Sequence, residues 1–220
     1  MTSAAPYRSR RGLHLYLGRA FFAADPVTVA RALVGAVLEV TAPGTRRASG
    51  RIVEVEAYGG PDDPASHAAG GPTPRSAIMF GPPGLAYVYF IYGMHHCLNV
   101  VTGPAGSAGA VLIRALEPLE GRDGMAVRRG LDPLRCHDRD LVGGPGRVCQ
   151  ALGIDLAWNG LPVTARAPSV PGAAGRLRLA VGGEPRSRVV SSCRIGVRRA
   201  AEVPWRFCDP DSACLSRPPD

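Results

Sequence analysis

The segment YVYFIYGMHHCLN, from Tyr87 to Asn99, predicts a β-hairpin. Aromatic and β-branched residues, which favour strands, lie on both sides of Gly93, where the chain can turn tightly. Side chains alternate between the two faces of a strand, so Tyr87 and Tyr89 share one face while Tyr92 points to the other. We therefore expect Tyr92 at the exposed end of the hairpin, directly before its turn.

Segments on either side of this hairpin also read as strands. Residues 36–40 (AVLEV) and 51–58 (RIVEVEAY) precede it, and residues 110–118 (AVLIRALEP) follow it. Arg114 interrupts the last of these apolar runs, so its charge is expected to be paired. Because strands outnumber helices and follow one another through short turns, the pattern predicts an α+β fold. We expect a single domain with a curved, mostly antiparallel β-sheet, open and barrel-like, flanked by helices and with the hairpin protruding.

Three segments predict helices. Asp25 followed by proline is typical of a helix start, and this helix is expected to end at Gly35. Residues 119–130 (LEGRDGMAVRRG) predict a second helix. Residues 143–154 (GGPGRVCQALGI) place a glycine-rich turn at the start of a third helix, where backbone N–H groups and Arg147 could hold a phosphate.

The length of the chain limits its organisation. With 220 residues it can form one sizeable hydrophobic core. Residues 1–17 lack hydrophobic periodicity and are expected to form a flexible N-terminal arm. Residues 18–208 are expected to form the domain that carries the functional site, and residues 209–220 a C-terminal tail.

The charge composition favours a polyanionic partner. The formal net charge is +8 and the pI is near 9.7, which makes nucleic acid a candidate. All 26 residues of the Lys and Arg class are arginine. Without lysine the side chains can form no Schiff base, and the chain has neither a P-loop lysine nor a pyridoxal lysine. The composition therefore excludes these side-chain chemistries, and any covalent amine chemistry would have to use the α-amino terminus.

The cysteines indicate neither a disulfide framework nor a metal site. The six cysteines include no CxxC pair, and the hydrophobicity pattern predicts neither a secretory segment nor a membrane span. Histidine and cysteine are neighbours at residues 95–97 and 136–137, but strand neighbours face opposite ways and these spacings fit no common zinc site. We expect reduced thiols, a cytoplasmic protein and no bound metal.

A carboxylate and two flat side chains suggest a pocket for a planar ring. Alternation along the strand puts Ile52, Glu54 and Glu56 on one face. Tyr58 ends the same face, and His67 follows in a loop rich in glycine and proline. Such a set could stack a planar base between rings while a carboxylate activates water. The alternative is that Glu56 is a solvated strand carboxylate and Tyr58 a half-buried packing residue.

Several motifs, in order along the chain, resemble the alkyladenine (3-methyladenine) DNA glycosylase family, the mammalian-type enzymes that also occur in bacteria. They are RIVEVEAYGGPDDPASHAAGGPTPRSAIMFGPPGLAYVYFIYGMHHCLNVVTG, AVLIRALEPLEG and GPGRVCQALGI. The resemblance covers roughly residues 18 to 207 and identifies residues 18–208 as the glycosylase catalytic domain.

The resemblance implies roles for the residues of the suggested pocket. Glu56 matches the general base that deprotonates the water attacking the sugar C1′. Arg114 matches an arginine close to that carboxylate and water. Tyr58, His67 and Tyr89 match the residues that stack around the flipped base.

Further matches concern the grip on DNA. Tyr92 matches the tyrosine that enters the duplex through the minor groove and fills the space that the base leaves. Asn99 matches a residue at the pocket floor that disfavours normal guanine. For contacts with DNA phosphates we nominate Arg75 and Arg147.

The resemblance implies a monofunctional DNA glycosylase of base excision repair in the bacterial cytoplasm, associated with the nucleoid. Its partner would be double-stranded DNA with damaged purines, alkylated and also deaminated or etheno, and the product an abasic site. The absence of lysine argues independently against a coupled strand-nicking lyase. No cofactor is expected, and the protein is expected to be a monomer. Two alternatives are a noncatalytic module that binds damaged DNA and an N-glycosidase that acts on free nucleosides.

Overall fold

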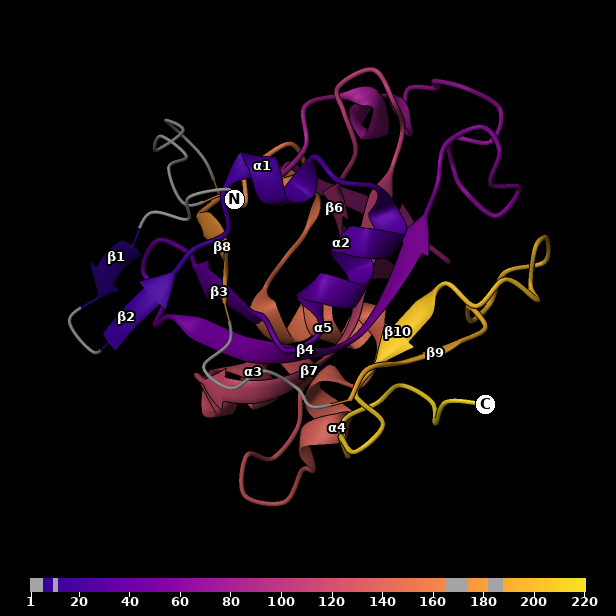
Figure 1. Cartoon of the computed structure of the whole chain (residues 1–220). Coiled ribbons are helices and arrows are strands. Elements are labelled where there is room, and N and C mark those ends of the chain that lie inside the picture. Colours follow the sequence, from indigo (N-terminus) through magenta and orange to yellow (C-terminus); the bar gives the residue numbers. More distant parts are fainter. Residues whose placement is uncertain (1–5, 10–11, 165–173, 182–187) are drawn as a thin grey trace.

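The structure, a computed structural model, describes residues 6–9, 12–164, 174–181 and 188–220 (Figure 1). Its strands are β1 (Pro6–Ser9), β2 (Gly12–Leu15), β3 (Val37–Thr41), β4 (Ala48–Tyr58), β5 (Ala86–Ile91), β6 (His95–Val101), β7 (Ala110–Glu120), β8 (Arg176–Ala180), β9 (Val190–Ser192) and β10 (Arg206–Cys208). Its α-helices are α1 (Arg19–Phe22), α2 (Pro26–Leu33), α3 (Arg122–Arg129), α4 (Asp138–Val142) and α5 (Pro145–Leu152), and its 3₁₀ helices are η1 (Ala77–Phe80) and η2 (Leu156–Trp158). No helix in these ranges is long and apolar enough to cross a membrane.

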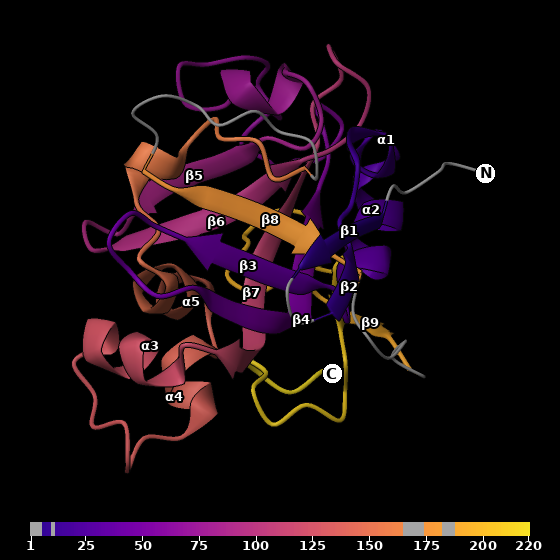
Figure 2. The ribbon, with the colours of Figure 1, turned by 90° about the vertical axis from the view of Figure 1, so that its left-hand side faces the viewer.

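Eight of the described strands form one curled sheet (Figure 2), which confirms the predicted α+β fold. The order is β5-β6-β7-β4-β10-β9, and β3 pairs with β4 and β8 beside this path, all in antiparallel fashion. Along one edge of β4, the first half pairs with β3 and the second half with β10. Because one long strand serves two neighbours on the same edge, the sheet curls into a half-barrel.

The main hydrophobic core lies between the sheet and helices α2 and α5. Helix α2 begins as predicted, because Asp25 accepts hydrogen bonds from Val27 N at 3.1 Å and Thr28 N at 2.9 Å. It ends at Leu33, shortly before Gly35 takes a φ of 93°. Helix α5 matches the third predicted helix. The second begins later than predicted, because β7 continues to the residue before the turn that opens α3.

The pairing of β4 with β7 contains three irregularities, and two of them offset each other. Val53 is an extra residue in β4, and Arg114 is an extra residue in β7 one step further along the ladder. A bulge of this kind re-aims the side chains around it. Ile52 and Val55 therefore both pack in the main core, while Val53 packs in a separate cluster under the C-terminal segment. The prediction that Ile52 shares a face with Glu54 is wrong for this reason.

Strands β5 and β6 form the expected hairpin. They pair up to Ile91, which leaves three residues in the turn. Tyr92 and Gly93 have positive φ angles of 55° and 68°, and a backbone hydrogen bond of 3.3 Å to the carbonyl of Ile91 closes the turn. Both signs are those of the central residues of a type I′ turn. Tyr92 therefore lies in the turn and not in a strand, so strand alternation does not apply to it.

Tyr16, after β2, and the C-terminal segment both pack against the main sheet. Tyr16, in the expected N-terminal arm, is buried, and its hydroxyl donates a hydrogen bond of 2.8 Å to a carboxylate of β3. Residues 1–5 and 10–11 of that arm lie outside the described residues. In the expected C-terminal tail, Cys214 and Leu215 are buried beside β4 and β10. This segment, which runs beside α4 in Figure 1, is thus packed against the domain.

Candidate active site

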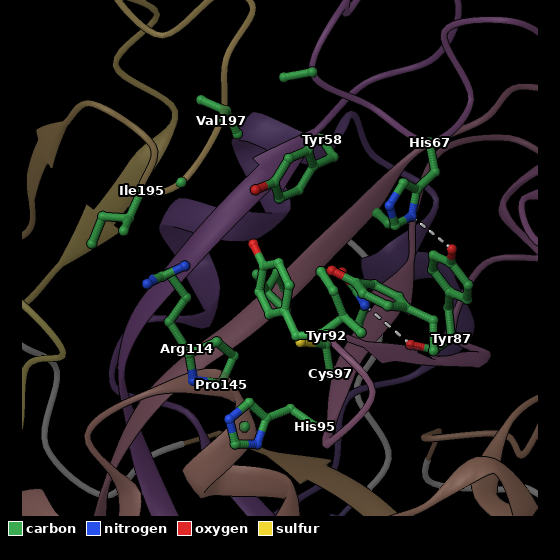
Figure 3. A pocket seen from close by; sticks show the side chains of 18 of the residues that line it. Tyr58, His67, Tyr87, Tyr92, His95, Cys97, Arg114, Pro145, Ile195 and Val197 are labelled. Carbon is green, nitrogen blue, oxygen red and sulfur yellow. Dashed lines mark hydrogen bonds between the residues drawn. The ribbon is translucent and has the colours of Figure 1, made fainter.

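Most of the predicted site residues surround one cavity (Figure 3). Its volume is about 490 Å³, within the range of small-molecule sites. It lies on the face of the sheet opposite the main core, between the β5–β6 hairpin and the loops at residues 59–75 and 193–205. The predicted residues that line it are Tyr58, His67, Tyr89, Tyr92, Asn99 and Arg114.

Three aromatic side chains form one wall of the cavity. Tyr87 and Tyr89 share a face of β5, as strand alternation predicts, and both line the cavity. His67 Nδ1 lies 2.8 Å from the hydroxyl of Tyr87, and the His67 and Tyr89 rings stand edge-on with centroids 4.7 Å apart. Burial and the charge of Arg75 lower the pKa of His67 below its usual value. The imidazole is therefore neutral near pH 7, and this wall carries no charge.

Arginines stack on two of the tyrosine rings. The guanidinium of Arg75 lies 4.6 Å from the ring centroid of Tyr89, and that of Arg194 lies 5.0 Å from the ring centroid of Tyr58. Such contacts are attractive because the face of an aromatic ring is negative. They hold both rings in place and bring positive charge close to the cavity.

Glu56 lies directly behind the cavity wall. Its side chain is 0% exposed, so the alternative of a solvated strand carboxylate is wrong. Oε2 accepts hydrogen bonds from the Tyr58 hydroxyl at 2.8 Å and from Arg114 Nη1 at 3.2 Å. Oε1 accepts one from Ile195 N at 2.6 Å. The residues that carry these three donors line the cavity, so they connect the buried carboxylate to it by hydrogen bonds.

Glu56 belongs to a buried group of two carboxylates and two guanidiniums. Arg114 Nε and Arg206 Nε donate to Oε1 of Glu54 at 2.9 Å and 2.8 Å. The charge of Arg114, which was predicted to be paired, thus meets both carboxylates. Burial opposes the ionisation of Glu54, but the charges of Arg114 and Arg206 and hydrogen bonds from Ser216 outweigh it and lower the pKa of Glu54. The two positive and two negative charges offset each other in the interior.

A second buried ion pair joins the two loops that border the cavity. Arg194 Nη1 and Nη2 donate to Oδ2 and Oδ1 of Asp63 at 2.7 Å and 2.9 Å, a bidentate geometry. Nη1 also donates to the carbonyl of Ala57 at 3.1 Å, and Asp63 accepts from Gly59 N at 2.9 Å. The loop that carries His67 is thereby fixed against the loop that follows β9.

Tyr92 stands at the rim of the cavity in a strained conformation. Its φ of 55° lies in the left-handed region, which costs a residue with a Cβ about 1–2 kcal/mol. Its side chain is 77% exposed, as predicted for the end of the hairpin. It also lines the cavity together with Tyr89, so the prediction that the two face opposite sides is wrong. A residue with a strained backbone and an exposed ring gains little from packing, which points to contact with a partner.

Cys97 and Asn99 of β6 line the cavity beneath these rings. Asn99 is buried, and its Nδ2 donates to the carbonyl of Tyr87 at 3.1 Å, which fixes the amide. Burial raises the pKa of the Cys97 thiol, so it stays protonated. This end of the cavity therefore offers neutral polar groups.

The two arginines nominated for phosphate contacts lie in different places. Arg75 is exposed and stacks on the Tyr89 ring beside the cavity. Arg147 of α5 donates to the carbonyl of Arg139 at 3.1 Å and lies 3.8 Å from Asp140. It does not itself line the cavity, although the two residues before it, Pro145 and Gly146, do. Among the residues that the structure describes, no three His, Cys, Asp or Glu side chains are placed to hold a metal ion.

Sequence reasoning missed several residues of the site. Arg206 carried the same signal as Arg114, because it interrupts the apolar run PWRFC. Ile195 contributes a backbone N–H group, which leaves no mark in a side-chain pattern. Asp63 and Arg194 are 131 positions apart, and no spacing rule connects them.

Comparison with known proteins identifies relatives along nearly the whole chain. The family model described as methylpurine-DNA glycosylase (MPG) matches residues 20–213. A protein of Rhodopseudomonas palustris strain CGA009, described as a 3-methyladenine DNA glycosylase, is 49% identical over 220 residues, which is 98% of this chain and 97% of the relative. Two proteins with the same description are similarly close. The one from Nitrosospira multiformis is 48% identical over 90% of this chain and 92% of its own. The one from Anaeromyxobacter dehalogenans strain 2CP-C is 49% identical over 92% and 87%.

Proposed function

The chain belongs to the methylpurine-DNA glycosylase family, as its motifs predicted, and on this premise we propose how its cavity works. It is a DNA glycosylase, a hydrolase of N-glycosyl bonds that serves DNA repair. We propose that it flips a damaged purine out of duplex DNA into the cavity and hydrolyses the bond between the purine and deoxyribose. The products are a free base and an abasic site.

One observation carries this proposal. A fully buried carboxylate, Glu56, is bonded to Tyr58 and Arg114 at the back of an aromatic cavity. The cavity opens beside Tyr92, whose backbone is strained and whose ring is exposed. A flat pocket, a carboxylate behind it and a wedge at its mouth are the three parts that excision of a base from a duplex needs.

In the proposed reaction Glu56 is the general base. It accepts a proton from water as the water oxygen forms a bond to C1′ of the sugar, and the electron pair of the N-glycosyl bond leaves with the purine. Hydrogen bonds from Arg114 and from the N–H of Ile195 orient the carboxylate. A purine methylated at N3 is cationic, so it departs as a neutral base without receiving a proton.

The aromatic wall and Asn99 are proposed to bind the flipped base. Tyr58, His67 and Tyr89 offer ring faces for stacking, which gains about 1–3 kcal/mol per base in comparable contacts. Because Arg75 and Arg194 already stack on two of these tyrosines, the positive charge beside the rings reduces the advantage of a cationic base. We therefore include neutral purines, hypoxanthine and ethenoadenine, among the proposed substrates beside 3-methyladenine.

Opening the duplex requires contacts outside the cavity. We propose that Tyr92 fills the space left by the flipped base, which offsets the few kcal/mol that unstacking costs. Arg75 and Arg147 are proposed to bind phosphates, in keeping with the net charge of +8. Because the chain contains no lysine side chain for a Schiff base, the enzyme is proposed to be monofunctional, without strand nicking. It is also proposed to act as a monomer.

The test uses duplex oligonucleotides that each contain a single 3-methyladenine, hypoxanthine or ethenoadenine. We expect release of the free base, measured by chromatography, and a strand that breaks only after alkali. Tight binding of all three duplexes without release of any base would instead support a noncatalytic damage-binding module. Hydrolysis of the corresponding free nucleosides at the same rate would support a nucleoside N-glycosidase.

A further inference from the structure

We infer that Ser216, in the C-terminal segment 214–218, is a positioning residue of the active site, which fixes Glu54 and through it the direction of Arg114 toward Glu56. The inference rests on the proposed function of Glu56 and Arg114. The family match ends at residue 213, so this segment lies just beyond the part of the chain that the family model covers.

Ser216 forms hydrogen bonds with both Glu54 and Arg114, the charged pair behind the cavity. Its backbone N donates to Oε2 of Glu54 at 2.7 Å, and its Oγ donates to Oε1 at 2.7 Å. The same Oγ accepts a hydrogen bond from Arg114 Nη2 at 3.3 Å. Within the described part of the chain, the N–H of Ser216 is the only group that donates a hydrogen bond to Glu54 Oε2. One residue therefore satisfies the carboxylate and steadies the guanidinium.

The guanidinium of Arg114 is fixed in three directions. Its Nε donates to Glu54, its Nη1 to Glu56 and its Nη2 to Ser216. A guanidinium is rigid and planar, so a shift of one of its nitrogens also shifts the other two relative to their acceptors. If Glu54 rotates, Nη1 must move relative to the carboxylate of Glu56.

The segment around Ser216 is held from two sides. Arg139 of α4 donates through Nε to the carbonyl of Leu215 at 3.1 Å and through Nη2 to the carbonyl of Ser216 at 3.3 Å. Arg206 of β10 donates to the carbonyls of residues 217 and 218. Leu215 is buried with Val53, the extra residue of the β4 bulge. Ser216 is thus placed by packing and not by a contact of its own alone.

The charge around Glu54 explains why two extra donors matter. The groups that face it are Arg114 from β7, Arg206 and Cys208 from β10, and Glu56 from its own strand. Burial raises the pKa of Cys208 to about 11, so this thiol is neutral. A buried carboxylate that loses either of these hydrogen bonds binds a proton more readily. Protonated Glu54 attracts Arg114 less strongly, which frees the guanidinium from its position.

The test compares Ser216→Ala, which removes the Oγ, with Ser216→Thr, which keeps it. Single-turnover excision of hypoxanthine from a duplex is measured across the pH range. We expect Ser216→Ala to excise about tenfold to a hundredfold more slowly, as small errors of position do. The acid limb of its rate profile should move to higher pH, while its Kd for duplex DNA stays that of the wild type. Ser216→Thr should restore rate and profile.

Ser212→Ala is the matched control, at a serine shortly before the segment 214–218. Ser212 Oγ donates to Glu117 Oε1 at 2.7 Å and accepts from Cys214 N at 3.3 Å, but it does not touch Glu54. We expect this variant to lose stability without a shift in the rate profile. An unchanged rate and profile for Ser216→Ala would overturn the inference, as would equal losses of rate in both serine variants.

A second measurement needs no activity and separates this inference from the proposed function. Because the pKa of Glu54 is lowered, its contribution to stability is present above its unfolded value and is lost as pH falls through the folded value. In urea unfolding, Ser216→Ala should move this loss to higher pH, and a chain that ends at Leu215 should move it further. A chain that ends at Pro218 should behave as the wild type. Coincident curves for all chains would overturn the inference even if no base is released.

Discussion

The hydroxyl of Tyr58 lies 2.8 Å from Oε2 of Glu56, and both side chains come from one face of β4. The ring of Tyr58 lines the cavity, and the guanidinium of Arg194 lies 5.0 Å from its centroid. Burial and the charge of Glu56 raise the pKa of Tyr58, so the hydroxyl remains a donor. The residue proposed to stack the base thus also orients the proposed catalytic carboxylate.

Glu56→Gln should abolish most of the excision activity while lesion binding is retained. Glutamine keeps the shape of the side chain, and its amide oxygen can still accept from Tyr58 and Arg114, but it cannot take a proton from water. Loss of a general base slows a reaction about 10²–10⁴-fold. Single-turnover kinetics and a Kd for lesion-containing duplex check this. Excision at the wild-type rate would place the base elsewhere.

Arg114→Met should destabilise the fold as well as stop the reaction. It leaves Glu54 and Glu56 buried with less positive charge, and breaking a buried ion pair costs about 3–5 kcal/mol. The free energy of unfolding from urea titration checks this. Arg198→Met, at an exposed position on the cavity rim, is the control and should leave this free energy unchanged. Equal stability of the Arg114 variant and the wild type would contradict the role of the buried charges.

Tyr92→Asn should weaken DNA binding without a loss of stability. Asparagine tolerates the left-handed φ of 55° better than tyrosine, so the hairpin should be as stable or more stable. Without the ring nothing replaces the flipped base in the stack. Leu134→Ala, at a 95% exposed position between α3 and α4, is the matched control and should bind DNA normally. Equal affinity of the Tyr92 and Leu134 variants for DNA would exclude the proposal that Tyr92 fills the space left by the flipped base.

Arg75→Gln should raise the pKa of His67 toward its usual value. Burial contributes most to the lowered pKa and the charge of Arg75 adds to it, so removal of that charge gives a partial return. Because the folded value lies below the unfolded value of about 6.5, neutral His67 contributes stability above that pH, and this is lost as pH falls through the folded value. NMR titration of the imidazole checks the shift. An unchanged titration would show that burial alone is responsible.

Arg75→Gln and Arg147→Gln should each reduce the salt dependence of DNA binding. Each phosphate contact that is lost lowers the slope of log K against log salt by about 0.9 for duplex DNA. Arg135→Gln, on the exposed loop between α3 and α4, serves as the control. Affinities measured over a series of salt concentrations check this. Slopes equal to that of the wild type would move the phosphate contacts to other arginines.

The local elements were predictable because each depends on a short pattern. The start of α2 follows from Asp25 before a proline, and the β5–β6 hairpin follows from aromatic runs around Gly93. The pairing of Arg114 followed from a charge within an apolar strand. Where a bulge or a turn changed the local geometry, alternation failed, and Ile52 and Tyr92 were assigned to the wrong faces.

The sequence by itself determined the family, the α+β class, the aromatic side chains of the cavity and the carboxylate behind it, because motifs and periodicity are properties of neighbouring residues. Only the tertiary structure decided that Glu56 is buried, that Asp63 meets Arg194, and that Ser216 completes the shell of Glu54. These contacts join residues more than a hundred positions apart. They form because the curled sheet brings distant segments together, and because buried charges must find partners wherever the fold supplies them.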